Sequence, residues 1–167
     1  MIDHENGFIW EMIILSVLSD ELKKYLNIDN WKYTEHRDGK LLAAQPIRCE
    51  HGTYEGFFDL RHPQRIDFYF KVPITIPEEK KEAISQFLHL ANYGLSAVTF
   101  ELHWERGEVR SRTTLIWVEE SAPSVETIKH HLIRNYLCLD EYFQGIAAIV
   151  YAGASPQEAL EKSERKK

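Results

Sequence analysis

Residues 65–76 read Arg-Ile-Asp-Phe-Tyr-Phe-Lys-Val-Pro-Ile-Thr-Ile, and this stretch decides the fold of the chain. Large apolar side chains occupy every second position, and polar or smaller residues occupy the positions between them. Successive side chains of a β-strand point to opposite faces, so this alternation predicts a strand with one buried and one solvated face. The buried set is Ile66, Phe68, Phe70, Val72, Ile74 and Ile76.

Other strands are predicted on both sides of this segment from alternation and turn signals. Short two-residue turns are expected at Asp38-Gly39, His51-Gly52 and Arg106-Gly107, because glycine readily adopts the backbone angles of tight hairpins. A longer loop, Arg61-His62-Pro63-Gln64, leads into the strand that begins at Arg65. The additional strands are 31–37, 41–50, 53–60, 96–105 and 108–118.

Helical periodicity predicts four helices, over residues 8–26, from about 77 to 94, from 125 to about 153, and after 155. Capping boxes are expected at Thr75/Glu78 and Ser155/Glu158, with Ser124 as a further N-cap. Gly94 is the expected left-handed cap of the second helix. The first helix is apolar nearly all round in its first half, which calls for cover by core or by a partner.

The order of these elements is α-ββββ-α-ββ-α-α, which predicts an α+β fold with an antiparallel sheet packed against helices. A chain of 167 residues suits one domain, and no linker or repeat divides it. We therefore expect a single domain over residues 1–167, with a short polar tail from about residue 161.

Composition excludes several classes of protein. The net charge of −6 argues against a dedicated nucleic-acid binder, whose surface is usually basic. The first residues carry Asp3 and Glu5 but no Lys or Arg, and the apolar stretch 8–18 is too short to span a bilayer. Cys49 and Cys138 form no Cys-x-x-Cys pair. We expect a cytoplasmic protein that does not contact membranes.

The sequence predicts no catalytic residue, metal site or cofactor. It contains no glycine-rich phosphate loop or nucleophile elbow. His130 and His131 are adjacent and so point in different directions on a helix. The carboxylates Asp59, Asp67 and Glu101 are expected as surface charges on the solvated face of the sheet.

The solvated face nevertheless carries a candidate partner-binding site. If His51-Gly52 is a two-residue turn and Arg61–Arg65 a five-residue loop, Phe57 lies opposite Tyr69 and beside Pro46. Two aromatic side chains on a solvated face suggest a contact surface. Alternatively, the third helix or its tail covers them, or they are exposed without a binding role. On the second hairpin, Arg110 and Arg112 could bind an anion or an acidic peptide. They could instead form a structural ion pair with Glu101, which is predicted opposite Arg112.

Several segments between residues 66 and 161 resemble the YbjN domain, the so-called bacterial sensory transduction regulator family. The resemblance implies a fold like that of type III secretion chaperones, which are small dimers that bind extended segments of other proteins. It brings no catalytic residues. The similar segments are Val72–Pro77, Leu90–Leu95, Phe100–Leu102, Gly107–Arg110, Pro123–Val125, Leu139-Asp140 and Ala154–Ala159.

Two functions are compatible with these observations. The first is a non-enzymatic, chaperone-like or regulatory protein that acts as a homodimer. It would hold a segment of an unidentified partner by strand addition or in an apolar groove. The alternative is a small-ligand-binding protein or an enzyme with a pocket between the sheet and the long helix. We favour the first, since no nucleophile–base pair is visible in the sequence.

Overall fold

The computed structural model describes residues 19–37, 39–62, 64–117 and 123–164. Within them, six strands form one sheet in the order β1-β2-β3-β4-β6-β5, and every neighbouring pair is antiparallel. The strands are β1 (Tyr33–His36), β2 (Leu41–Arg48), β3 (Thr53–His62), β4 (Arg65–Thr75), β5 (Thr99–His103) and β6 (Glu108–Ile116).

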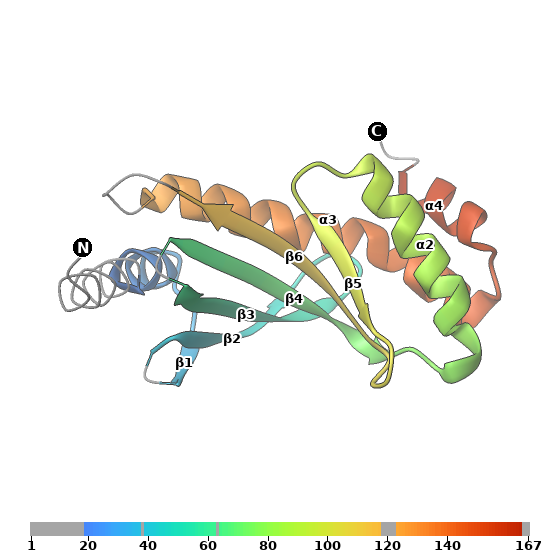
Figure 1. The fold of residues 1–167 in the computed structure, drawn as a ribbon, viewed down its shortest axis with the longest axis horizontal. Coiled ribbons are helices and arrows are strands. Elements are labelled where there is room, and N and C mark those ends of the chain that lie inside the picture. The colour runs from blue at the N-terminus through green and yellow to red at the C-terminus, as the bar shows by residue number, and fades with distance from the viewer. Residues whose placement is uncertain (1–18, 38, 63, 118–122, 165–167) are drawn as a thin grey trace, which may run out of the picture.

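Helices form the second layer. A 3-10 turn leads into α2, α3 runs along the sheet, and α2 and α4 lie next to each other at one end of it (Figure 1). This order and layering confirm the predicted α+β fold. The described helical segments are an N-terminal helix (residues 19–28), η1 (Glu78–Lys80), α2 (Lys81–Gly94), α3 (Val125–Ala152) and α4 (Pro156–Glu164).

The core lies between α3 and one face of the sheet. The alternating side chains of β4 behave as predicted, since Ile66, Phe68 and Phe70 are completely buried. Their contacts identify the covering helix: the ring centroid of Tyr136 lies 5.6 Å from that of Phe70. Asn135 Nδ2 donates a 2.8 Å hydrogen bond to the backbone carbonyl of Phe68. We call the opposite side of the sheet, turned away from α3, the outer face.

The register of the second hairpin differs from the prediction by two residues. Leu102 lies opposite Val109, and Glu101 lies opposite Arg110 rather than Arg112. Residues 104–107 form a four-residue loop in place of the expected two-residue turn. Gly107 has φ of +63°, and a Cβ atom there would lie 2.4 Å from the Ile76 carbonyl oxygen. A shift by two residues leaves every side chain on its predicted face.

The predicted pairing of β2 with β3 is also wrong in part. A bulge separates Ala44 from Ile47, and Ala43 instead of Pro46 lies opposite Phe57. Proline has no backbone N–H to donate to a neighbouring strand, so it interrupts the ladder at this point. The turn after β2 is longer than two residues and is closed by the 2.8 Å bond from Cys49 N to Gly52 O. In contrast, the pairing of Phe57 with Tyr69 is as predicted. The loop predicted at Arg61–Gln64 is wrong, because β3 continues to His62, which pairs with Arg65 after a register shift.

The helix caps are predicted only in part. Ser124 accepts a hydrogen bond from Thr127 N, and Ser155 and Glu158 form the expected capping box. The box at Thr75/Glu78 is absent from this described segment, because the cap position is Pro77 and no side chain caps it. Gly94 is the last residue of α2 and lacks a positive φ, so its prediction as a left-handed cap is wrong.

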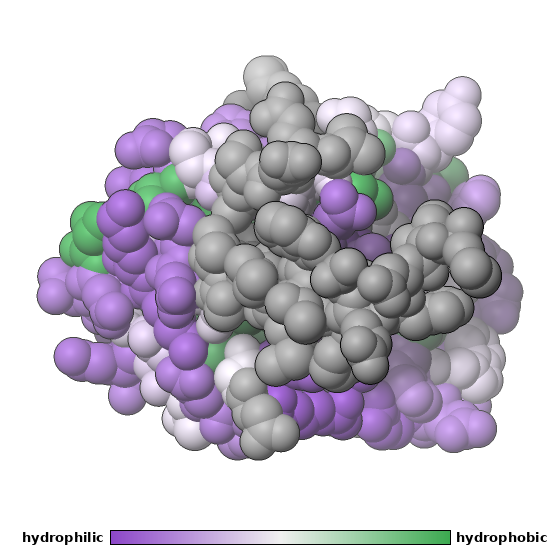
Figure 2. Space-filling view, turned by 60° about the vertical axis from the view of Figure 1, so that its left-hand side comes forward, coloured by the Kyte–Doolittle hydropathy of each residue, from purple (hydrophilic) through white to green (hydrophobic). Residues whose placement is uncertain are grey.

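The first predicted helix is described only in its second half. Leu22, Tyr25 and Leu26 lie on its buried side and belong to the main core. The apolar residues 8–18 lie outside the described residues, so the expectation of cover around them stays a prediction. At the end of the molecule nearest this helix, the described surface in view is mainly hydrophilic, with small separate hydrophobic patches (Figure 2).

Candidate functional site

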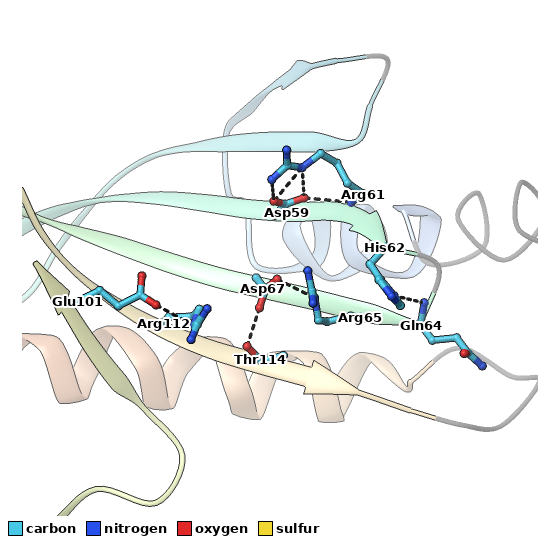
Figure 3. Close-up of polar contacts among 9 residues, drawn as sticks. All are labelled: Asp59, Arg61, His62, Gln64, Arg65, Asp67, Glu101, Arg112 and Thr114. Carbon is cyan, nitrogen blue, oxygen red and sulfur yellow. Dashed lines mark hydrogen bonds and ion pairs between the residues drawn. The ribbon is translucent and has the colours of Figure 1, made fainter. Parts of the chain in front are cut away.

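The candidate site lies on the outer face. Polar side chains of β3 and β4 lie in front of the sheet in Figure 3, while the N-terminal helix and α3 lie behind it. Phe57 and Tyr69 face the same way as these polar side chains, because they alternate with the buried residues of their strands. Both rings are half-buried. The sheet therefore presents an aromatic pair on the side that these helices leave uncovered.

A hollow of about 540 Å³ lies over this aromatic pair. We call it the outer-face hollow. It brings together Phe57, Tyr69 and Arg110 from the predicted site, and it excludes Pro46 and Arg112. Pro46 lies instead in the bulge of β2. The lining residues are Arg37, Leu41, Phe57, Asp59, Arg61, Tyr69, Lys71, Arg106, Glu108 and Arg110.

Arg110 has two partners at this site. Its guanidinium carbon lies 4.2 Å from the centre of the Tyr69 ring, which is a stacking contact. Its Nε lies 2.7 Å from Glu101 Oε2, and Arg112 Nε lies 3.1 Å from Glu101 Oε1. The predicted structural ion pair is therefore present, and Glu101 shares its charge between the two arginines.

A second carboxylate is shared in the same way. Glu108 Oε1 lies 3.7 Å from Lys71 Nζ and 3.4 Å from Arg106 Nε. In the described part of the chain, Arg37 has no ion-pair partner at all, although it lines the hollow. Its backbone is left-handed, with φ of +52°. The hollow thus carries five cationic and two acidic side chains, in a chain whose net charge is −6.

The prediction that Asp59 and Asp67 are solvated surface charges is wrong. They lie opposite each other on β3 and β4, and they are only 8% and 4% exposed. Asp59 is bound by Arg61, while Arg65 Nε lies 2.9 Å from Asp67 and Thr114 donates to it (Figure 3). These neighbours cover the carboxylates, which a face assignment from sequence could not show.

Arg61 stabilises the charged form of the Asp59 carboxylate. Burial by itself would raise the pKa of Asp59, because it disfavours the charged carboxylate. The hydrogen bonds and positive charge of Arg61 outweigh burial, so the pKa of Asp59 lies below its ordinary value. At neutral pH the pair is a salt bridge at the rim of the hollow and offers no proton for acid–base catalysis.

The alternative function needs a pocket between the sheet and α3. A second hollow lies nearby, between α3 and residues 95–98, which precede β5. Its volume is about 620 Å³. His130 and Cys138 line it, but no hydrogen bond between His130 and a carboxylate occurs in the described residues. In the described part of the chain, this hollow therefore shows no imidazole oriented by a carboxylate as a general base would be.

The outer edge of β5 is closed to strand addition at its centre. Asn92 of α2 accepts a 2.7 Å hydrogen bond from Phe100 N and donates a 3.0 Å bond to Phe100 O. A side-chain amide thus takes the place of a neighbouring strand there. The opposite edge is β1, which is only four residues long and mostly exposed. Short edge strands are a common protection against pairing with other chains.

Cys49, the second cysteine of the chain besides Cys138, lies near the polar side chain of Asp140. Its pKa is raised to about 11, by burial and then by the charge of Asp140. Asp140 accepts hydrogen bonds from the Tyr54 hydroxyl (2.7 Å) and from His51 N (3.0 Å). This cluster ties α3 to the turn between β2 and β3, and it keeps the thiol protonated and weakly nucleophilic at neutral pH.

Among the described residues, no group of three or more His, Cys, Asp or Glu side chains is placed to hold a metal ion. A bilayer would need a longer and more apolar helix than any found in the described ranges.

Comparisons with known proteins identify the family. A family model described as "YbjN: Putative bacterial sensory transduction regulator" matches residues 18–137, more than half of the chain. The fold is similar to the crystal structure of "YbjN, a putative transcription regulator from E. coli", with a TM-score of 0.57 and 11% sequence identity. The similarity covers 88% of this chain and 92% of that one. The comparison with curated proteins gave no match. The chain belongs to the YbjN family.

Proposed function

We propose that this protein is a non-enzymatic binding module that holds a short segment of a partner protein in the outer-face hollow. The observation that carries the proposal is the convergence of Phe57, Tyr69 and Arg110 on one hollow of about 540 Å³. Such a volume is typical of specific binding sites, and aromatic and arginine side chains are the residues that most often dominate binding energy.

Recognition by side chains on the sheet face is better supported than strand addition. Asn92 occupies the hydrogen-bonding groups of Phe100 at the β5 edge, and β1 offers only four residues. A partner strand would find few free backbone groups at either place. The outer-face hollow, by comparison, presents both an apolar surface and charged groups to a side chain that enters it.

The YbjN family is described as a regulator family, and regulation through a bound partner is compatible with such a module. We also propose that the protein acts as a homodimer, as the resemblance to secretion chaperones implies. Sedimentation velocity at several protein concentrations tests this. A single species with the mass of one chain at all concentrations would contradict the homodimer.

The binding proposal is tested by capture of partners from the native cell extract with tagged protein, followed by mass spectrometry. Phe57→Ala and Tyr69→Ala are compared with wild type, and Tyr151→Ala serves as a control because it removes an exposed aromatic ring from α3. We expect both sheet variants to lose a stoichiometric partner and the control to keep it.

Folding of each variant is checked by circular dichroism before capture. If the folded Phe57→Ala and Tyr69→Ala variants keep every partner of the wild type, the outer face is not the binding site. If wild type captures no stoichiometric partner, the proposed function itself fails.

A further inference from the structure

We propose that the segment held in the outer-face hollow is acidic, with one carboxylate toward each end and an apolar or aromatic residue between them. This inference rests on the proposed function and names the chemistry of the partner. It is carried by the charge of the hollow and by the order of its residues across the sheet.

The cations of the hollow are incompletely neutralised. Glu108 is divided between Lys71 and Arg106, and Glu101 is divided between Arg110 and the neighbouring Arg112. In each of these two groups, one carboxylate neutralises two cations. A carboxylate of the partner can therefore bind cations whose positive charge is only partly neutralised. The rest of the chain is acidic enough to give a net charge of −6, so this hollow is a local positive site on a negative molecule.

Among the described cations of the hollow, Arg37 is the one without an ion-pair partner. It follows β1 with a left-handed backbone, which is uncommon for a residue with a side chain. Strained residues of this kind often occur at binding sites. Arg37 lines the hollow, and none of the described acidic residues pairs with it. A carboxylate of the partner can therefore bind Arg37 without displacing an ion pair to any described residue.

The strand order sets the pattern of the ligand. Arg37 lies at the β1–β2 side of the hollow, while Arg106 and Arg110 lie at the β6 side. Phe57 and Tyr69 lie between them, paired on β3 and β4. Cations at both ends and aromatic rings in the centre match an acid–apolar–acid sequence.

The span of the hollow sets the length of the segment. From β2 to β6 there are three inter-strand spacings of about 4.8 Å, or about 14 Å in total. An extended chain advances about 3.3 Å per residue, so about four or five residues cross the site. The small side chain of Ala43 lies opposite Phe57 and leaves its ring accessible from that side, whereas Arg110 already stacks on Tyr69. We therefore assign the central apolar contact to Phe57.

The test begins with a phage library of random twelve-residue peptides selected on wild-type protein. We expect enrichment of peptides with two acidic residues three to five positions apart and an apolar or aromatic residue between them. An enriched peptide is then synthesised with a fluorescent label, together with its analogue in which Gln replaces Glu and Asn replaces Asp. Binding is measured by fluorescence anisotropy.

Charge variants connect the peptide to the hollow. Arg37→Gln and Arg110→Gln should each weaken binding of the acidic peptide about fivefold. The variant that combines both substitutions should bind the acidic peptide as weakly as wild type binds the amide analogue. Lys162→Gln is the matched control, since it removes one exposed positive charge from α4 in the helical layer. It should leave the affinity unchanged.

The outcomes separate this inference from the proposed function. Selection of neutral or basic peptides, or acidic peptides that bind both arginine variants as well as wild type, would overturn the acidic preference and leave partner capture standing. The same selection is run on the Phe57→Ala variant. If wild type enriches no peptide more strongly than this variant does, the inference and also the choice of the outer face are overturned. Binding of a labelled twenty-residue oligothymidylate that depends on Arg37 and Arg110 would assign the hollow to nucleic acid instead.

Discussion

Replacing Gly145 by alanine should destabilise the protein, although alanine is the better helix former. Gly145 lies within α3, where the exchange would ordinarily add about 1 kcal/mol to the free energy of unfolding. A Cβ atom there would lie 2.6 Å from Phe87 Cζ and 2.6 Å from Ser163 Oγ. Both neighbours are buried, and Ser163 is further held by a 3.0 Å hydrogen bond to Ala159 O.

The magnitude follows from these two contacts. Overpacking of a tight core costs about 1–3 kcal/mol, and the upper end applies because neither buried neighbour has room to move. After the gain in helix propensity, Gly145→Ala should lose about 2 kcal/mol. Gly94→Ala is the matched control, because it is also helical but its nearest neighbouring atom, Glu164 Oε1, lies 3.8 Å from the new Cβ. It should gain about 0.5–1 kcal/mol.

Urea unfolding followed by circular dichroism measures both changes. With a slope of about 2 kcal/mol per molar urea, the midpoint of Gly145→Ala should fall by about 1 M while that of Gly94→Ala rises slightly. If Gly145→Ala unfolds at the same or a higher urea concentration than wild type, the junction of α2, α3 and α4 is not tightly packed. The reasoning from the Cβ contacts would then be wrong.

Three other predictions concern polar contacts. In urea unfolding, Asp140→Asn should lower the free energy of unfolding by about 2 kcal/mol, because it removes a charged acceptor of two hydrogen bonds. Tyr54→Phe removes only one donor and should lower it by about 1 kcal/mol. Variants as stable as wild type would contradict this. Asn92→Ala frees the backbone N–H and C=O groups of Phe100 at the sheet edge. Light scattering should therefore show more self-association of this variant than of wild type as the protein concentration rises. The same degree of association in both proteins would contradict the prediction. Folding lowers the pKa of Asp59, so its ion pair with Arg61 stabilises the fold above the unfolded pKa near 3.8, and this contribution is lost as the pH falls through the pKa of the folded state. The difference in unfolding free energy between wild type and Asp59→Asn should therefore be larger at pH 7 than at pH 3. Equal differences at both pH values would refute this prediction.

Much of the fold was accessible to sequence reasoning because its signals are local. The alternation along β4 depends only on neighbouring positions, and it correctly separates Phe68 and Phe70 from Tyr69. The caps at Ser124 and Ser155 also depend on side chains within one turn of the chain. Such features are decided before distant parts of the chain meet.

The candidate site was only partly accessible. The pairing of Phe57 with Tyr69 was predicted from a five-residue loop, whereas the structure has a shorter loop and a register shift between Asp59 and His62 that leads to the same pairing. Pro46 was misplaced because the bulge in β2 shifts the register beyond it. Arg37 was missed altogether, since the sequence placed it in a strand, whereas it follows β1 with a left-handed backbone and lines the hollow. A positive φ at an arginine has no clear signal in the sequence.

The sequence alone determined the order of the described elements, the buried face of β4 and the α+β class of the fold. These follow from hydrophobic period and turn chemistry, which act over a few residues. Tertiary structure decided the exact pairing of β2 with β3, the burial of Asp59 and Asp67, and the collection of cations around Phe57. These depend on which side chains from separate strands meet, and that is settled only when the whole sheet has formed.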